Sequence, residues 1–288
     1  MLIAAALRWT DQRAIVDPLT GEVRTSTAGS GPSEADRCAL EHGLRLAAAL
    51  RGRCVAITVG PPAADAMLRD ALAAGADAVL RVDPQASADK NDDHDGHRTA
   101  RLLHQGLINR HGPPDVVVCG DRSTDRGTGS TPAFLAALLG AQQALGLLEL
   151  STVDGFGELA AVRRLDGGRR ERLRIGLPAV CSVEPTDVRL RRAPLPAVLA
   201  ARGAPIPVVA GEVPVDGRVR VTAVRPYRPR ARVVANGTAD RDADPHRRMV
   251  ALSGTLTRHD PPRLVTPESP AAAAGELLTF LREHGYLA

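Results

Sequence analysis

Short apolar segments alternate with longer amphipathic segments over the first two thirds of the chain. Segments of strand length followed by segments with helical spacing are typical of βαβ units, in which the strands pair in parallel. Val116, Val117 and Val118 follow one another in the fourth apolar segment, as expected for a strand buried on both faces of a sheet. The pattern predicts an α/β fold with a doubly wound parallel sheet, whose strands lie at about 3–7, 55–59, 78–82 and 115–119.

Helices are expected between and after these strands. Ser33 is the type of residue that caps a helix N-terminus, and Leu40 and Leu44 follow it at helical spacing. Gly75 and Gly140 directly follow two other amphipathic segments, where a glycine commonly ends a helix. The expected helices extend from the Ser33 cap to about residue 50, and over 63–74, 98–111 and 131–139.

Turn residues predict two β-hairpins in addition to the parallel sheet. Residues 13–16 and 22–24 flank Asp-Pro-Leu-Thr-Gly, whose proline and glycine favour a turn. Residues 159–165 and 172–175 flank Asp-Gly-Gly in the same way, and a further strand is expected at 179–183. The second hairpin is an addition to the alternating α/β pattern.

The last part of the chain has a different character. From about residue 204 it is rich in Pro, Arg and Gly with little periodicity, and an amphipathic helix is expected only at 271–284. Such a segment has little core of its own. We therefore expect an α/β domain over residues 1–203 and an extended C-terminal arm over 204–288, which wraps around a partner subunit.

Composition narrows the class of protein. The chain has 288 residues, of which 44% are hydrophobic but only 2% aromatic, so the core must consist of Ala, Val, Leu and Ile. No apolar run approaches the roughly 18 residues of a membrane-spanning helix, so no integral membrane segment is expected. The N-terminal residues lack the basic region and cleavage pattern of a signal peptide. These features predict a cytoplasmic protein.

The positive charge does not indicate a nucleic-acid partner. The net charge is +4, and Lys90 is the only lysine among the 37 basic residues. The arginines are scattered, and the aromatic residues that would stack on bases are scarce. We therefore expect no nucleic acid among the partners.

Neither the cysteines nor an acidic tract predicts a metal site. Cys38, Cys54, Cys119 and Cys181 are widely spaced and include no C-x-x-C, which favours buried thiols over disulfides or metal ligands. Residues 83–96 contain several Asp and His side chains that could be drawn as ligands. Their adjacency in one polar tract favours a solvated loop instead, because metal ligands usually come from separated rigid positions.

The segment Gly120–Thr131 is the strongest candidate for a binding site. It leaves the end of a buried strand and enters a helix, where unpaired backbone N–H groups and the helix dipole attract anions. Neither a Walker A lysine nor a G-x-G-x-x-G pattern is present. The segment is therefore either a phosphate cradle or an ordinary hydroxyl-rich loop that caps a helix. The candidate residues are Gly120, Arg122, Ser123, Thr124, Asp125, Gly127, Thr128, Gly129, Ser130 and Thr131.

Four motifs, taken in their order and spacing, resemble the β subunit of electron transfer flavoproteins. The resemblance covers about residues 1–205, with a weaker match at the C-terminus, and it favours the phosphate cradle. The motifs are Ile3–Arg8 followed by Asp11, Val59-Gly-Pro61 followed by Ala71–Asp77, Cys119-Gly120 through Thr128-Gly129, and Leu177–Val180 followed by Leu195-Pro196.

The resemblance implies an adenine-nucleotide-binding α/β domain in an electron-carrier subunit rather than an enzyme. Members pair with a larger α subunit, carry FAD at the interface, and pass electrons from a dehydrogenase to a downstream quinone or other acceptor. The β subunit holds a structural AMP, or a second FAD in some relatives. By alignment the nucleotide would contact the loop Gly120–Thr131, in which Asp125 matches the family's Asp, together with Ala5, Ser33, Asp36 and Val59.

Some residues depart from the family pattern at this site. Asp121 stands where a lysine usually follows the first glycine, and Arg122 or Arg126 would have to supply the missing positive charge. The choice between AMP and FAD therefore stays open. The other departures are Gly127, Ser130 and Pro132 in the loop, and Gln12 where the family often places an aromatic residue near the flavin.

The resemblance also assigns a docking role to Leu195 and Pro196. A leucine at this place anchors the family's docking loop on the dehydrogenase. The preceding residues 188–192 read Val-Arg-Leu-Arg-Arg and differ from the family's usual sequence, which suggests a different dehydrogenase. The alternative is that Leu195 merely starts a helix that packs on its own domain.

Two other functions remain as alternatives. A free-standing adenine-nucleotide-binding module of the same α/β type would usually be about half as long, and it would lack the second hairpin, the docking loop and the arm. A nucleotide-dependent ligase or hydrolase would need a basic triphosphate clamp. Residues 120–131 do not provide one.

Overall fold

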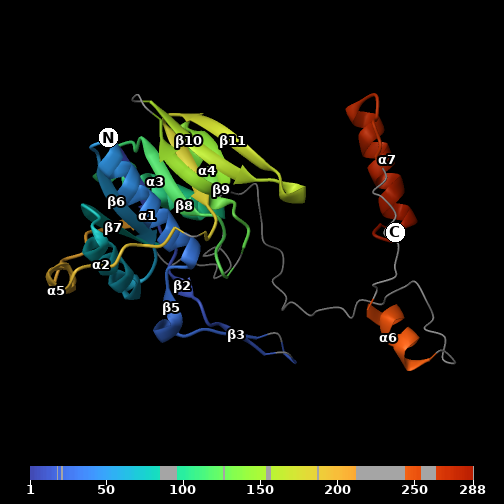
Figure 1. The fold of residues 1–288 in the computed structure, drawn as a ribbon, viewed down its shortest axis with the longest axis horizontal. Helices are drawn as coiled ribbons and strands as arrows, with labels where there is room; N and C mark the ends of the chain where they lie inside the picture. Colours follow the sequence, from blue (N-terminus) through green and yellow to red (C-terminus); the bar gives the residue numbers. More distant parts are fainter. Residues whose placement is uncertain are drawn as a thin grey trace. The chain divides into compact units, whose positions relative to one another are not determined.

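A mostly parallel sheet forms the centre of the first of two units, Met1–Arg228 and Pro229–Ala288 (Figure 1). The computed structural model describes residues 1–17, 19–20, 22–84, 96–125, 127–153, 157–186, 188–211, 244–253 and 264–287. Within these ranges, nine strands pair in one sheet. In spatial order they are β11 (Arg170–Gly176), β10 (Glu158–Arg164), β9 (Gln142–Thr152), β12 (Ala179–Val183), β8 (Val116–Gly120), β1 (Leu2–Ala6), β6 (Arg53–Val59), β7 (Ala78–Pro84) and β13 (Val208–Gly211).

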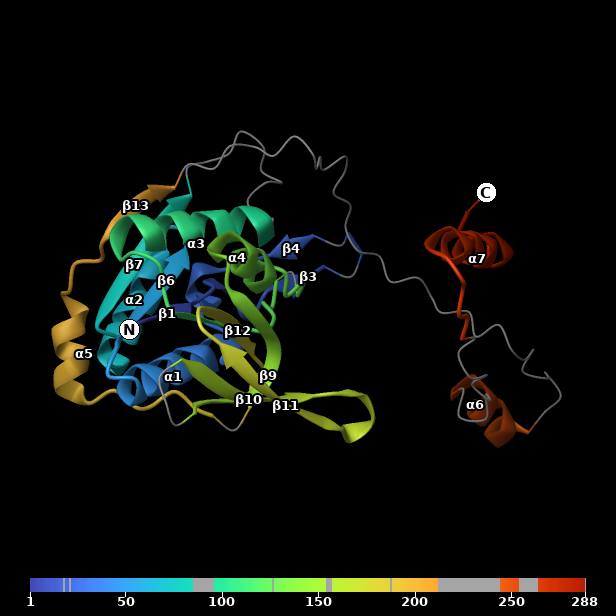
Figure 2. The same cartoon turned by 90° about the horizontal axis from the view of Figure 1, so that it is seen from above.

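Helices cover both faces of the sheet, which confirms the predicted doubly wound α/β fold. Helices α1 (Glu34–Ala49) and α2 (Asp65–Ala74) pack on one face, and α3 (Gly96–Arg110) and α4 (Thr131–Leu139) pack on the other (Figure 2). Side chains of β1 alternate between the two apolar layers. Ile3 and Ala5 belong to the first and Ala4 and Ala6 to the second, so this strand is buried on both sides.

The helix ends have the local chemistry that the sequence predicts. Ser33 is the N-cap of α1: its Oγ accepts a hydrogen bond from the Asp36 N–H at 3.1 Å, and the Asp36 carboxylate accepts one from the Ser33 N–H at 2.9 Å. This reciprocal pair is a capping box. Gly75 ends α2 at φ 114° and Gly140 ends α4 at φ 60°, conformations that favour glycine.

Small antiparallel elements match the predicted hairpins. Strands β3 (Ile15–Val16) and β4 (Val23–Arg24) pair with each other, as do β10 and β11 around the short helix η4 (Asp166–Gly168). The remaining short elements of this unit are β2 (Thr10–Asp11) paired with β5 (Ser30–Gly31), and the helices η1 (Thr27–Gly29) and η2 (Pro62–Ala64).

Several elements of this unit were not predicted, among them the short strands β2 and β5 and the helix η1. Strand β9 joins the parallel part of the sheet to the hairpin, and Gly146 at φ 68° lies within it, where the register with β12 shifts. That irregularity interrupts the alternation by which a strand is recognised. Strand β13 pairs in parallel with β7, so the sheet continues past residue 203, where we expected the α/β domain to end. Helix α5 (Leu195–Arg202) was only an alternative.

The second unit contains two described helices, α6 (Pro245–Ser253) and α7 (Pro270–Glu283). Helix α7 matches the predicted terminal helix, whereas α6 was not predicted. On α7 the side chains of Leu277, Leu278 and Phe280 are exposed. Among the described residues of the whole chain, no helix has both the length and the apolar character needed to cross a membrane.

The capping box yields a prediction about stability. Ser33→Ala removes the hydroxyl that caps α1 and a donor to the buried Asp36 carboxylate, so the free energy of unfolding should fall by about 1–2 kcal/mol. Ser26→Ala removes the cap of the short, exposed η1 and should change stability by less than about 0.5 kcal/mol. Urea unfolding of both variants measures the difference. If both variants lose the same free energy of unfolding, the capping box of α1 does not stabilise the protein more than the cap of η1 does.

Candidate functional site

A cleft opens at the carboxyl ends of β1, β6 and β8, between the starts of α1, α3 and α4. Ligands of open α/β sheets bind at this edge. Its empty volume, which includes space open to solvent, is about 730 Å³. Leu7, Val59 and Leu103 contribute apolar wall, and hydroxyl groups and charged side chains line the rest.

The structure brings together part of the predicted residue set in this cleft. Eight of the predicted residues line it: Asp36, Val59, Gly120, Arg122, Ser123, Thr128, Gly129 and Thr131. They come from β6, β8, α1, α4 and the loop between β8 and α4, which we call the phosphate loop (residues 121–130).

The other predicted residues have different positions. Ala5 is fully buried within β1, and the Ser33 hydroxyl is used by the α1 cap. Asp125 lines a neighbouring cleft rather than this one. Thr124, Gly127 and Ser130 belong to the phosphate loop without lining the cleft.

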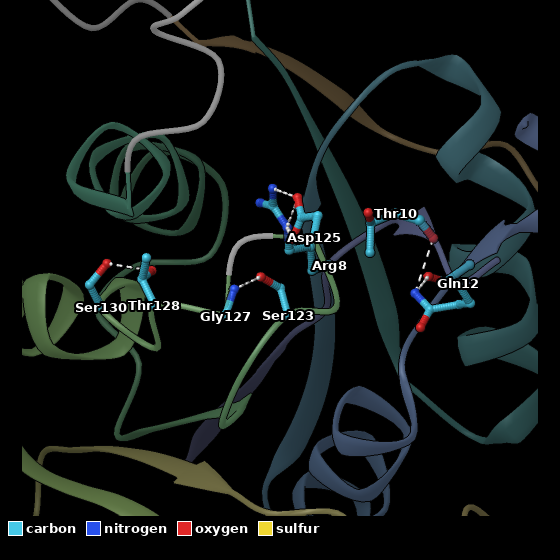
Figure 3. A network of polar contacts seen from close by, with 9 residues as sticks. Arg8, Thr10, Gln12, Ser123, Asp125, Gly127, Thr128 and Ser130 are labelled. Carbon is cyan, nitrogen blue, oxygen red and sulfur yellow. Dashed lines mark hydrogen bonds and ion pairs between the residues drawn. The ribbon is translucent and has the colours of Figure 1, made fainter. Parts of the chain in front are cut away.

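Two helix N-termini meet at the cleft. A Cβ atom on Gly96, the first residue of α3, would lie 2.2 Å from the Ser130 Oγ and 3.3 Å from the Thr131 Oγ1, so the start of α3 lies directly against the start of α4. Ser130 Oγ is also 3.1 Å from Thr128 Oγ1 (Figure 3). Both helix starts carry partial positive charge and hydroxyl groups, which together favour an anion.

Two glycines give the phosphate loop its shape. Gly127 and Gly129 have φ angles of 64° and 60°, in the left-handed region. A Cβ atom on Gly129 would lie 3.0 Å from the Asp121 carbonyl oxygen, so a side chain there would be both strained and crowded. The backbone at Gly129 can therefore form part of the cleft wall.

An ion pair fastens the phosphate loop to the end of β1. The Arg8 Nε donates to both carboxylate oxygens of Asp125, at 3.0 and 3.1 Å, and the Arg8 Nη2 also donates to this carboxylate (Figure 3). Arg8 lines the cleft and its neighbour alike. The positively charged Arg8 guanidinium is thus held at the place where the two clefts meet.

Asp121, which departs from the family pattern, is paired within the protein. One carboxylate oxygen accepts a hydrogen bond from the Ser182 Oγ at 3.2 Å, and the other accepts one from the Arg122 Nε at 3.2 Å. These contacts reduce the repulsion that Asp121 would exert on a phosphate. Arg126 lies outside the described residues.

Asp36 forms the buried floor of the cleft. Its carboxylate accepts hydrogen bonds from the N–H groups of Ser33 and Arg8, at 2.9 and 3.3 Å, and from the Ser33 hydroxyl. Burial raises the pKa of Asp36 above its ordinary value, although these bonds oppose the shift. With these three donors, Asp36 fixes the start of α1 to the end of β1.

Comparison with known proteins decides the family. The sequence profile of the electron transfer flavoprotein domain matches residues 20–214, which include the phosphate loop and most of the sheet. The chain belongs to the electron transfer flavoprotein beta-subunit family. The resemblance of the four motifs is thereby confirmed.

Individual relatives have low sequence identity to this chain. The beta subunit of Methylophilus methylotrophus is 30% identical over 152 residues, which are 53% of this chain and 55% of that one. FixA of Rhizobium meliloti is 29% identical over 191 residues, 65% of this chain and 63% of that one. The beta subunit of Chromohalobacter salexigens is 28% identical over 277 residues, 94% and 91% of the two chains. The match to the first two thus spans between half and two thirds of their length.

Several residues at the site of this electron transfer flavoprotein chain were missed from sequence. Arg8 is the first charged residue after the apolar run of β1, and Thr99 lies in the first turn of α3, so their positions at a carboxyl edge and a helix start were available signals. Both residues also line the neighbouring cleft, whose empty volume is about 1270 Å³. That cleft includes Trp9, Arg98 and Asp125.

The structure also shows where the predicted docking residues and the cysteines lie. Leu195 begins α5, and its side chain is 69% exposed, while Pro196 follows it in the first turn. All four cysteines are buried and free, as predicted. The described residues contain no cluster of three or more metal-ligating side chains, and residues 85–95 of the acidic tract lie outside them.

The Arg8–Asp125 ion pair yields a prediction about the phosphate loop. Asp125→Asn keeps the shape of the side chain but removes its charge, so amide hydrogen exchange at residues 121–130 should accelerate roughly fivefold, the equivalent of about 1 kcal/mol. Arg122→Gln is the control, because the Arg122 side chain is 74% exposed in its pair with Asp121. Unchanged exchange in Asp125→Asn would mean that the ion pair with Arg8 does not hold the loop.

Proposed function

We propose that this chain is the β subunit of a heterodimeric electron transfer flavoprotein in the cytoplasm. It pairs with an α subunit, and the pair carries electrons from a partner dehydrogenase to a quinone or another downstream acceptor. The FAD at the subunit interface accepts and releases the electrons. The observation that carries the proposal is the family match over residues 20–214, in a fold whose phosphate loop lines the cleft at the carboxyl edge.

The residues of the cleft fit the phosphate of an adenine nucleotide. The starts of α3 and α4 supply backbone N–H groups, and Ser123, Thr128 and Thr131 supply hydroxyl donors. Arg8 and Arg122 add positive charge, while Asp121 is already hydrogen-bonded to Ser182. We therefore propose that this chain binds AMP, or a second FAD, through the phosphate loop.

The neighbouring cleft bears on the choice between AMP and FAD. It shares Arg8, Val59 and Thr99 with the first cleft, so a ligand longer than a mononucleotide could extend from one into the other. The two clefts therefore leave room for either nucleotide, and mass spectrometry of extracted protein identifies which one is bound.

We propose that the C-terminal arm packs on the α subunit. The arm expected from the sequence covers residues 204–288 and therefore includes α6 and α7. Leu264, Leu277, Phe280 and Tyr286 are exposed within the described part of the second unit, so a covering partner would bury apolar surface.

The phosphate loop yields a prediction about nucleotide retention. Gly129→Val should abolish the adenine nucleotide that is extracted from the purified protein, because the side chain would strain the loop and crowd the Asp121 carbonyl. Gly140→Val is a matched control, since Gly140 has the same φ of 60° but lies at the far end of α4 with open space around it.

Mass spectrometry measures the nucleotide in both variants. Retention in Gly140→Val with loss in Gly129→Val supports the site. If the wild-type protein contains no AMP, ADP or FAD, or if Gly129→Val retains its nucleotide, the proposed site is wrong.

The exposed start of α5 yields a prediction about docking. We propose that Leu195 and Pro196 dock on the dehydrogenase, and Leu195→Ala should then weaken the encounter by about 2 kcal/mol, or roughly thirtyfold in affinity. With the dehydrogenase that reduces the wild-type flavoprotein, KM should rise while flavin content and reduction by dithionite stay unchanged. Leu165→Ala, at the distant β10–β11 hairpin, is the control. An unchanged KM in Leu195→Ala would place docking on another surface.

A further inference from the structure

Helix α1 carries a carboxylate that is buried away from the phosphate-loop cleft. The Glu41 side chain is only 4% exposed. A buried carboxylate is unfavourable unless charged or polar partners compensate for the loss of water. The partners of Glu41 therefore indicate what this residue holds in place.

Most of these partners come from a segment far away in the sequence. Arg191 donates three hydrogen bonds to the Glu41 carboxylate: from its backbone N–H at 3.1 Å, from Nε at 3.0 Å and from Nη2 at 3.1 Å. Arg45, one turn along α1, donates a further bond from Nε at 2.8 Å. Burial alone would raise the pKa of Glu41, but the bonds from Arg191 and Arg45 lower it below its ordinary value.

Glu41 holds the backbone of this segment as well as a side chain. The Arg191 N–H is one of the three donors, so the chain itself is fixed at this residue. Two neighbouring contacts support the same attachment. The Cys38 thiol donates to the Val188 carbonyl oxygen at 2.9 Å, and Leu190 packs against the apolar layer that contains α1.

The attached segment leads directly into α5. Leu195 starts that helix four residues after Arg191, and Pro194 and Pro196 limit the conformations of the connection. Helix α5 lies beside α2 (Figures 1 and 2). Of its residues only Ala201, near the end, is buried. The start of α5 therefore depends on the segment before it more than on its own packing.

We infer that Glu41 is a positioning residue: by holding Arg191 on α1, it fixes the direction in which Leu195 is presented to the dehydrogenase. This inference rests on the docking role proposed above. An exposed anchor that is ordered before binding loses less conformational entropy on docking. The Glu41–Arg191 contact thus connects the packing of α1 to the docking surface.

The experiment uses the full-length chain and needs no dehydrogenase. A nitroxide label is attached to the cysteine of the Leu195→Cys variant. The native cysteines are buried, and the protein without this substitution, treated with the same label, measures the background. Glu41→Gln and Arg191→Gln, each added to this labelled protein, should narrow the lines of the nitroxide spectrum, because the label would move faster. In the same variants without the label, amide exchange at residues 189–193 should accelerate about tenfold. Arg45→Gln is the matched control, because it removes a bond to the same carboxylate without touching the segment.

The pattern over these variants decides the inference. Faster motion in Glu41→Gln and Arg191→Gln but not in Arg45→Gln supports it, and the double variant should be no more mobile than either single one. Equal mobility in all proteins would overturn it, as would an increase in Arg45→Gln of the same size. If Glu41→Gln does not fold, Arg191→Gln still tests the inference, because the Arg191 side chain is 45% exposed and its replacement should not prevent folding.

A second measurement separates this inference from the docking role itself. In assays with the dehydrogenase that reduces the wild-type protein, Arg191→Gln should raise KM and leave kcat unchanged. If Leu195→Ala raises KM but Arg191→Gln does not, the positioning role is wrong and the docking role stands. If Leu195→Ala does not change KM, the docking role fails, whatever the mobility of the label.

Discussion

The parallel pairing of β1 with β6 on one side and β8 on the other is the constraint on which the site depends. Because all three strands point the same way and are buried between two helical layers, their carboxyl ends must open at one edge. Val59 and Gly120, the last residues of β6 and β8, and Arg8, which lies shortly after β1, therefore meet at the cleft although they are far apart in the sequence. Any ligand of this edge is surrounded by turns and helix starts.

The close packing of the helix starts then determines what the edge can bind. Gly120 leaves little room for a side chain, since a Cβ there would lie 3.0 Å from the Asp36 carboxylate and 3.1 Å from the Ala35 Cβ. Gly96 likewise leaves little room for a side chain between the starts of α3 and α4. The resulting wall combines the apolar side chains of Leu7, Val59 and Leu103 with helix starts, hydroxyl groups and the Arg8 guanidinium, and these last features support the proposed phosphate ligand. Asp36 and Asp121 are both hydrogen-bonded within the protein, which limits their effect on a bound anion.

The sequence predicted those features that have a local signature. The Ser33 cap, the glycines that end α2 and α4, and the phosphate loop are each encoded in a few adjacent residues. Strand β9 was missed because Gly146 interrupts its pattern, and β13 because it is a short edge strand after an apparent boundary. Contacts such as Arg8–Asp125, 117 residues apart, and Glu41–Arg191, 150 apart, leave no local pattern at all. The place of residues 120–131 between a buried strand and a helix, strengthened by the family resemblance, indicated the cleft, but only the fold identified these partners.

We propose that the cleft and the C-terminal arm both belong to one half of a flavin-carrying heterodimer. The most direct measurement is co-expression with the α subunit, followed by affinity purification of this chain and an absorbance spectrum of the purified complex. We expect a 1:1 complex with flavin absorbance, together with an adenine nucleotide that stays with this chain when the subunits are separated. A compact monomer with a protease-resistant arm, which binds neither the α subunit nor a nucleotide, would contradict it.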